Sequence, residues 1–210
     1  MRRAKLGDVY AMHLTNGIKL FQWAYHVPKQ GTYIRVFDGL YQTIPTNLDQ
    51  IVQGEHTYII GFHVSRAYRI GLVEFLDNLP VPEKYQHPMY TIEFWPYELN
   101  EQFGVWIRPS CFDTSENRHK IYSFDDLDSI ADLPKEFQNV KWMDCFISPD
   151  WLMFLFDYDF TFDNPRRHCP RYVLGEKADA VLDGYQKRVN YLVDQDRAKR
   201  KTNNKRYLAL

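Results

Sequence analysis

The chain of 210 residues lacks the features that mark several large classes of protein. It holds only three cysteines, Cys111, Cys145 and Cys169, which lie far apart without Cys-x-x-Cys spacing, so neither a disulfide framework nor a zinc site is predicted. No apolar run approaches the roughly eighteen residues that a membrane helix requires. The first residues also lack the apolar segment of a signal peptide. We therefore expect a cytoplasmic protein that has no membrane partner.

Motifs of catalysis are also missing from the sequence. Only 10 residues are glycine and they are not clustered, which excludes a glycine-rich loop that cradles phosphate. The seven histidines form no His-x-His or His-Glu-x-x-His motif, and the spacing of His56 and His63 suits neither one helix face nor one side of a strand. Ser110 and the cysteines lack the sharp glycine turn of an exposed nucleophile. We therefore expect no catalytic residues, no bound metal, no cofactor and no enzyme activity.

Charge is nearly balanced overall but uneven along the chain. The net charge is −1, yet the segment 197–210 holds six cations and no acid, so residues 1–196 carry −7. An acidic body argues against nucleic acid as a partner. The basic segment 197–210 is expected to be a mobile, solvated end.

Aromatic residues are abundant, with 15 Tyr, 14 Phe and 5 Trp, and they favour β-sheets. The segments 7–14 and 17–25 are typical of two antiparallel strands, joined by a tight turn at Asn16-Gly17 in which both residues tolerate positive φ. The first of these segments is apolar on both faces, so we expect it to be covered on both sides. A third strand is predicted over residues 32–39.

Four short motifs in this half of the chain carry a family resemblance. They are Gly-Asp-Val-Tyr-Ala at residues 7–11, the Asn16-Gly17 turn, Arg-Val-Phe-Asp at residues 35–38 and Arg-Ile-Gly-Leu-Val-Glu-Phe at residues 69–75. Together they resemble the immunity protein 26 family, antidotes in bacterial polymorphic-toxin systems, over residues 5 to about 95. The resemblance implies a non-enzymatic immunity protein that binds and neutralises a cognate toxin domain.

The remaining patterns complete the N-terminal half. Residues 46–52 predict a short helix that is capped by Thr46 or Asn47 and stopped by Gly54. Strands are predicted over residues 57–64, 89–95 and 104–108, whereas residues 69–76 fit either a strand or a helix.

The second half is predicted to contain more helix. Ser123 is a candidate helix cap, and the apolar segments 140–147 and 151–162 are predicted to be buried strands. Residues 176–198 are expected to form one amphipathic helix, because apolar side chains recur there at steps of three and four residues. The members of this stripe that we expect to be buried are Val181, Tyr185, Val189 and Leu192. The stripe could cover the sheet or a second copy of the chain, so a homodimer through this helix is possible.

The fold class predicted from these elements is α+β. A bent antiparallel sheet or small β-barrel occupies the N-terminal half, and helices, including the long C-terminal amphipathic helix, occupy the C-terminal half. We expect residues 1–110 to form a β-rich, immunity-like domain and residues 111–210 to form an α+β extension packed on it.

One acidic row is the candidate functional site. Alternation along the predicted strand 151–162 and its continuation puts Asp157, Asp159 and Asp163 on one face, with Tyr158 on the other. Such a row could be a solvated outer face, could bind the basic cleft of a toxin, or could hold a divalent cation together with His168 in a metal-dependent hydrolase or nuclease. For the row itself we favour the solvated face, with toxin binding next and the metal site last. If the surface binds a toxin, the partner-binding residues that it predicts are Trp151, Asp157, Tyr158, Asp159 and Asp163.

Overall fold

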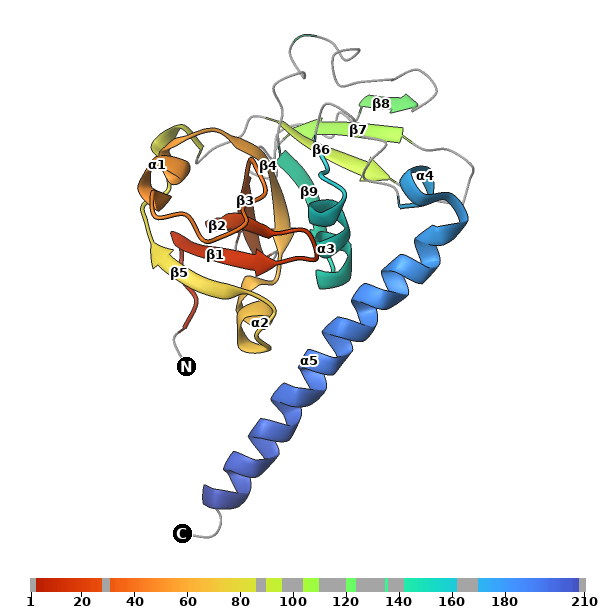
Figure 1. Cartoon of the computed structure of the whole chain (residues 1–210). Helices are drawn as coiled ribbons and strands as arrows, with labels where there is room; N and C mark the ends of the chain where they lie inside the picture. The colour runs from red at the N-terminus through yellow and green to blue at the C-terminus, as the bar shows by residue number, and fades with distance from the viewer. Residues whose placement is uncertain are drawn as a thin grey trace.

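A computed structural model describes residues 3–27, 31–85, 90–95, 104–109, 120–123, 135, 142–161 and 170–207. Its described strands form one sheet in the order β5-β1-β2-β3-β4-β9-β6-β7-β8 (Figure 1). The strands are β1 (Asp8–His13), β2 (Ile18–Val27), β3 (Gly31–Phe37), β4 (His56–Phe62), β5 (Glu74–Asn78), β6 (Tyr90–Trp95), β7 (Gly104–Pro109), β8 (Lys120–Ser123) and β9 (Trp142–Ile147). The helices are α1 (Leu48–Gln53), α2 (Val64–Arg69), α3 (Pro149–Asp157), α4 (Pro170–Leu174) and α5 (Ala178–Tyr207), with short 3₁₀ turns at Glu83–Tyr85 and Gly175–Lys177.

The N-terminal half is a bent antiparallel sheet, as predicted. The strands β5, β1, β2, β3 and β4 are neighbours in that order, and each pair is antiparallel. Register shifts interrupt three of these four pairings, and such bulges increase the local twist of a sheet. The described pairings leave β5 and β8 as edges, so the sheet is open. The α+β class is confirmed.

The first hairpin is confirmed, although its turn differs from the prediction. His13 pairs with Ile18, and the backbone N–H of Leu14 donates to the carbonyl of Gly17 at 2.8 Å. The loop therefore spans four residues, and within it only Gly17 has a positive φ, of 152°. The carbonyl of Tyr41 would lie 2.8 Å from a Cβ on Gly17, so this glycine also allows a second segment to approach closely.

The second half of the chain contributes to the same sheet. Strand β9 lies parallel between β4 and β6, with Ile59 opposite Trp142 and Ile92 opposite Met143. Helix α3 follows β9 directly and returns across the face of the N-terminal strands (Figure 1). Residues on both sides of residue 110 therefore share one sheet and one core.

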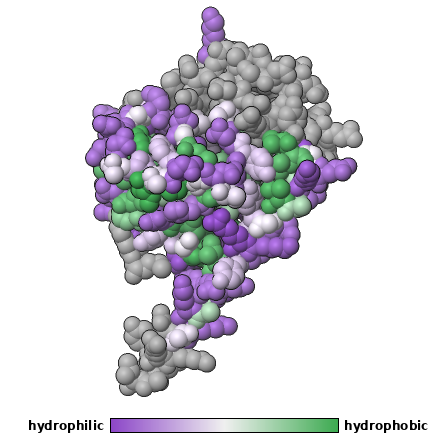
Figure 2. Space-filling model, viewed as in Figure 1, coloured by the Kyte–Doolittle hydropathy of each residue, from purple (hydrophilic) through white to green (hydrophobic). Residues whose placement is uncertain are grey.

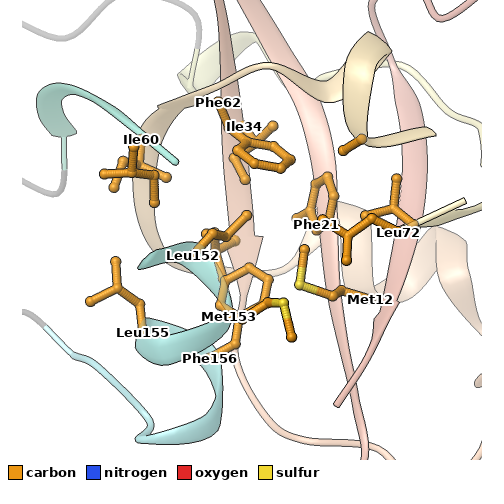
Figure 3. Close-up of a cluster of buried hydrophobic side chains, with 14 of the residues drawn as sticks. Met12, Phe21, Ile34, Ile60, Phe62, Leu72, Leu152, Met153, Leu155 and Phe156 are labelled. Carbon is orange, nitrogen blue, oxygen red and sulfur yellow. The ribbon is translucent and has the colours of Figure 1, made fainter. Parts of the chain in front are cut away.

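The main core lies between this sheet face and α3. Figure 3 shows Leu152, Met153 and Phe156 of α3 directed toward Met12 and Phe21 of the strands. Five consecutive residues of α3, Leu152 to Phe156, are buried, so the helix is enclosed on nearly all sides. At about 25 cal/mol for each Å² of apolar surface removed from water, burying one such side chain stabilises the folded state by about 1.5–3 kcal/mol.

The opposite face of the sheet carries a second core. Val9, Ala11 and Leu20 point there and are covered by Val52 of α1 and by neighbouring apolar residues of the segment 40–51. Strand β1 is therefore buried on both sides, as the sequence predicts. Helix α1 is also confirmed, with Asn47 as its N-cap residue and Gly54 as its C-cap residue.

The long C-terminal helix is confirmed and extends beyond the predicted end. Helix α5 begins at Ala178 and continues through Tyr207 as 30 residues, about 45 Å at 1.5 Å per residue. Val189 is buried, and Leu182, Tyr185, Leu192 and Val193 pack partly buried against the main core. The apolar stripe is therefore used within the chain. Residues 197–207, predicted to be a mobile end, are helical here.

The prediction of a strand over residues 151–162 is wrong. Residues 151–157 form most of α3, which ends at Asp157. An unbroken apolar run has no periodicity that distinguishes a buried strand from a buried helix. The helix start is nevertheless visible in the sequence, because Ser148 occupies the N-cap position, Pro149 follows it, and Asp150 lies in the first turn.

Two other elements complete the comparison. The segment 69–76, predicted as either strand or helix, is divided between the end of α2 and the start of β5. Ser123, the predicted helix cap, is the last residue of β8, and the helix expected after it lies outside the described residues.

Candidate functional site

The predicted acidic row does not exist as a row. Asp157 is the last residue of α3, Tyr158 is its C-cap residue, and Asp159 follows with a positive φ of 48°. The chain therefore turns at these residues instead of extending, and period-two alternation does not apply to them. Asp163 and His168 lie outside the described residues.

Asp157 forms a hydrogen bond that joins α3 to α5. Its Oδ2 atom accepts a hydrogen bond of 2.7 Å from the hydroxyl of Tyr185 on α5, whereas its Oδ1 atom is buried and has no hydrogen-bond partner among the described residues. Burial and this hydrogen bond raise the pKa of Tyr185, so the hydroxyl remains a donor at neutral pH. The pair fastens α5 to the end of α3 and is a structural contact.

Asp159 lies beside a buried lysine. The Nζ atom of Lys19, on β2, is 3.8 Å from Oδ1 of Asp159, with exposed side-chain fractions of 4% for the lysine and 70% for the aspartate. Burial lowers the pKa of Lys19, while Asp159 and Asp38 oppose that shift. A cation at this place is also favoured by the negative end of the α3 dipole. Lys19 and Asp159 therefore anchor the end of α3 to the sheet.

The two aromatic members of the predicted surface are half-buried. The ring of Tyr158 stacks on Phe154 with centroids 5.0 Å apart, and the ring of Trp151 meets Phe154 edge-on at 6.3 Å. Among the four predicted partner-binding residues that the structure describes, Asp159 alone is in the exposed class. Reversing the charge of Asp157 would break the contact with Tyr185, so these aspartates cannot be tested together as a free surface.

No metal centre is formed by the described residues. Within them, no group of three or more His, Cys, Asp or Glu side chains could hold a metal ion. His56 is buried on β4, where its ring meets Tyr85 edge-on at 4.6 Å, and His63 is the residue before α2.

A buried arginine organises the opposite face of the sheet. Arg35 on β3 is fully buried and donates to the carbonyls of Val52 and Gly54 at 2.9 and 2.8 Å, and to Oε1 of Gln22 at 3.3 Å. Its guanidinium lies 4.1 Å from the ring centroid of Tyr85, an attractive cation–π geometry. Burial lowers the pKa of Arg35 to about 10, so the group stays charged at neutral pH. It holds the end of α1 and the turn at Glu83–Tyr85 against the sheet.

A cleft between α2 and α5 is the feature that sequence reasoning missed. Two neighbouring hollows, of about 460 Å³ and about 550 Å³, lie along α5. The first is lined by Arg66 of α2, the start of α3 and α5, and the second is lined by residues 68–71 and α5. In the sequence, the cations of segment 197–210 indicate a basic surface. Arg66 and Arg69 of α2 can be assigned to that surface only after the fold has placed α2 beside α5. We call this region the α2–α5 cleft.

Comparison of the chain with protein-family models, with curated proteins and with solved structures finds no match. In the described part of the chain, no helix combines the length and apolar character required to span a membrane.

Proposed function

We propose that this protein is a non-enzymatic immunity protein that binds and neutralises a cognate bacterial toxin domain. One observation carries the proposal. Three of the residues that resemble the immunity protein 26 family, Gly7, Asp8 and Arg35, also hold the N-terminal sheet together. The resemblance therefore includes positions whose side chains or backbone are needed for the fold of this sheet.

Gly7 is the first of these positions. Its φ of +86° belongs to the left-handed region that favours glycine, and an added Cβ would lie 2.6 Å from the carbonyl oxygen of Leu79. Its own N–H donates to the carbonyl of Trp23 and its carbonyl accepts from the N–H of Leu79. Another residue here would strain the backbone and separate these segments.

Asp8 supports the same argument. The residue is fully buried, and its carboxylate accepts hydrogen bonds from the N–H of Lys5, the hydroxyl of Tyr10 and the side-chain amide of Asn78. These contacts join the start of the chain to β1 and β5. Arg35, from the third motif, fills the corresponding role between β3 and α1.

Neutralisation by an immunity protein requires binding alone. Such binding would occlude or distort the toxin and would consume one copy of this protein for each toxin molecule. The proposal therefore places the function on an exposed surface and assigns no reaction to the buried Lys19 or to the acidic residues at the end of α3.

Protection of cells tests the proposal. We expect a gene beside this one to encode the toxin domain. That domain is induced in bacteria with and without this protein, and a toxin domain from an unrelated locus is the control. We expect growth to be restored with the neighbouring toxin and not with the control. Growth arrest that is unchanged at high levels of soluble, folded protein would refute the proposal.

A further inference from the structure

The α2–α5 cleft has an excess of positive charge. Five cations line its two hollows, and three acids accompany them. The cations are Arg66, Arg69, Arg197, Lys199 and Arg200, and the acids are Asp150, Asp194 and Asp196.

Much of the negative charge in the cleft is already paired. The Oδ2 atom of Asp196 forms ion pairs with Nε of Arg200 at 3.0 Å and Nε of Arg69 at 3.8 Å, and its side chain is only 16% exposed. Asp194 pairs with Arg197 at 3.3 Å. By contrast, Arg66 and Lys199 are exposed and form no ion pair with the described residues. Arg66 and Lys199 therefore remain available to a partner. The excess of positive charge lies in the second hollow, because in the first hollow Asp150 balances the formal charge of Arg66.

The floor of the cleft is apolar. Val189 and Val193 line the first hollow, and Tyr68 and Ile70 line the second. Val189 and Ile70 are buried, and the other two are half-buried. Apolar area mixed with arginine and tyrosine is typical of surfaces that bind proteins, whereas contacts to nucleic-acid phosphates are mainly polar and cationic.

The helix continues the positive field past the cleft. Beyond Asp196, α5 carries six cations and no acid up to Tyr207; three of them line the cleft, and Lys201, Lys205 and Arg206 follow it in the sequence. Figure 1 shows this part of the helix projecting away from the body. In Figure 2, hydrophilic residues dominate the described surface of this end. Residues 1–196 carry −7, so a long polyanion that crosses the body would be repelled, while a compact acidic segment can contact the cleft and the arm alone.

We infer that the α2–α5 cleft is a docking surface for an acidic segment of the toxin domain. This inference rests on the proposed function and identifies the surface and the partner chemistry for it. Acidic side chains of the toxin would pair with Arg66 and Lys199, and apolar side chains between them would cover Val193 and Tyr68.

Charge reversal at the two unpaired cations tests the inference. The double variant Arg66→Glu, Lys199→Glu is compared with the matched control Lys135→Glu, Lys177→Glu, which reverses two exposed lysines that line neither hollow. Binding of the inactivated toxin domain encoded beside the gene is followed by surface plasmon resonance. We expect the cleft variant to associate at least about tenfold more slowly, because electrostatic steering alone accounts for factors of this size.

Salt provides a second readout of the same contact. Raising the salt from about 0.1 M to about 1 M shortens the screening length from roughly 10 Å to roughly 3 Å, so the difference between the cleft variant and wild type should shrink. The melting temperature of both variants should match wild type, because all four substituted residues are exposed.

The possible outcomes separate the two proposals. If wild type binds the toxin domain and the cleft variant binds like the matched control, the cleft inference is overturned and the proposed function stands. If wild type neither binds nor protects, both are overturned. If a fluorescent duplex oligonucleotide binds wild type as tightly as the toxin does and the cleft variant loses that binding, the surface serves phosphate backbones and the protein assignment is wrong.

Discussion

Arg35 offers the sharpest test of the structural argument, because a fully buried guanidinium is expected to hold three segments together. Replacing it with methionine keeps much of the volume and removes two well-formed, charge-assisted hydrogen bonds to the carbonyls of Val52 and Gly54. Each such bond contributes about 1.5–3 kcal/mol. The methionine variant also avoids the cost of burying a charge, which offsets part of that loss.

We therefore expect Arg35→Met to lower the free energy of unfolding by about 2–4 kcal/mol. For a chain of this size, the melting temperature should fall by roughly 5–15 °C. Urea denaturation measures the change, and Arg66→Met is the control, because Arg66 is exposed and its loss should change stability by less than about 0.5 kcal/mol. If Arg35→Met were as stable as wild type, the cost of burying the guanidinium would cancel its bonds, and Arg35 would not be an anchor.

Three further changes test the helix contacts. Gly184→Ala should stabilise the protein by about 0.5–1 kcal/mol, since glycine is unfavourable within a helix and an added Cβ meets nothing within 4 Å; a destabilised variant in thermal melting would contradict this. Tyr185→Phe leaves the carboxylate of Asp157 without its hydrogen bond and should cost about 1–3 kcal/mol in urea unfolding; no loss would show that the contact does not fasten α5. The pKa of Lys19 in the folded state lies below its ordinary value of 10.5, so the folded state releases this proton at a lower pH than the unfolded state does. As pH rises toward 10.5, the free energy of unfolding of wild type relative to that of Lys19→Met should therefore increase. A constant difference from about pH 7 to about pH 10 would contradict that sign.

Local patterns predicted much of the fold. The hairpin followed from alternation and the Asn16-Gly17 turn, and α5 followed from an apolar stripe with a regular helical period. Helix α3 was mistaken for a strand because Leu152 to Phe156 are all buried, and an element that is enclosed on all sides carries no amphipathic signal. The pairing of β9 with β4 was not predictable, since no local feature of either strand specifies a parallel neighbour from the other half of the chain.

The candidate site was harder to predict because it depends on the helical structure of residues 151–157 and on contacts between distant elements. The acidic row depended on the strand assignment, and once residues 151–157 are helical, Asp157 turns toward Tyr185 and Asp159 toward Lys19. The α2–α5 cleft requires the docked position of α5, which depends on contacts of Val189, Tyr185 and Arg188 with distant elements. Charge counting located the basic segment, but only the fold brings Arg66 beside it.

Inhibition of the toxin by stoichiometric binding is the most direct test of the central claim. The purified toxin domain encoded beside the gene is held at a fixed concentration, and its activity is measured while this protein is added in increasing amounts. The account predicts a linear fall in activity that reaches zero near one equivalent, together with a complex of defined mass by light scattering. Full toxin activity at a large excess of folded protein would contradict the account.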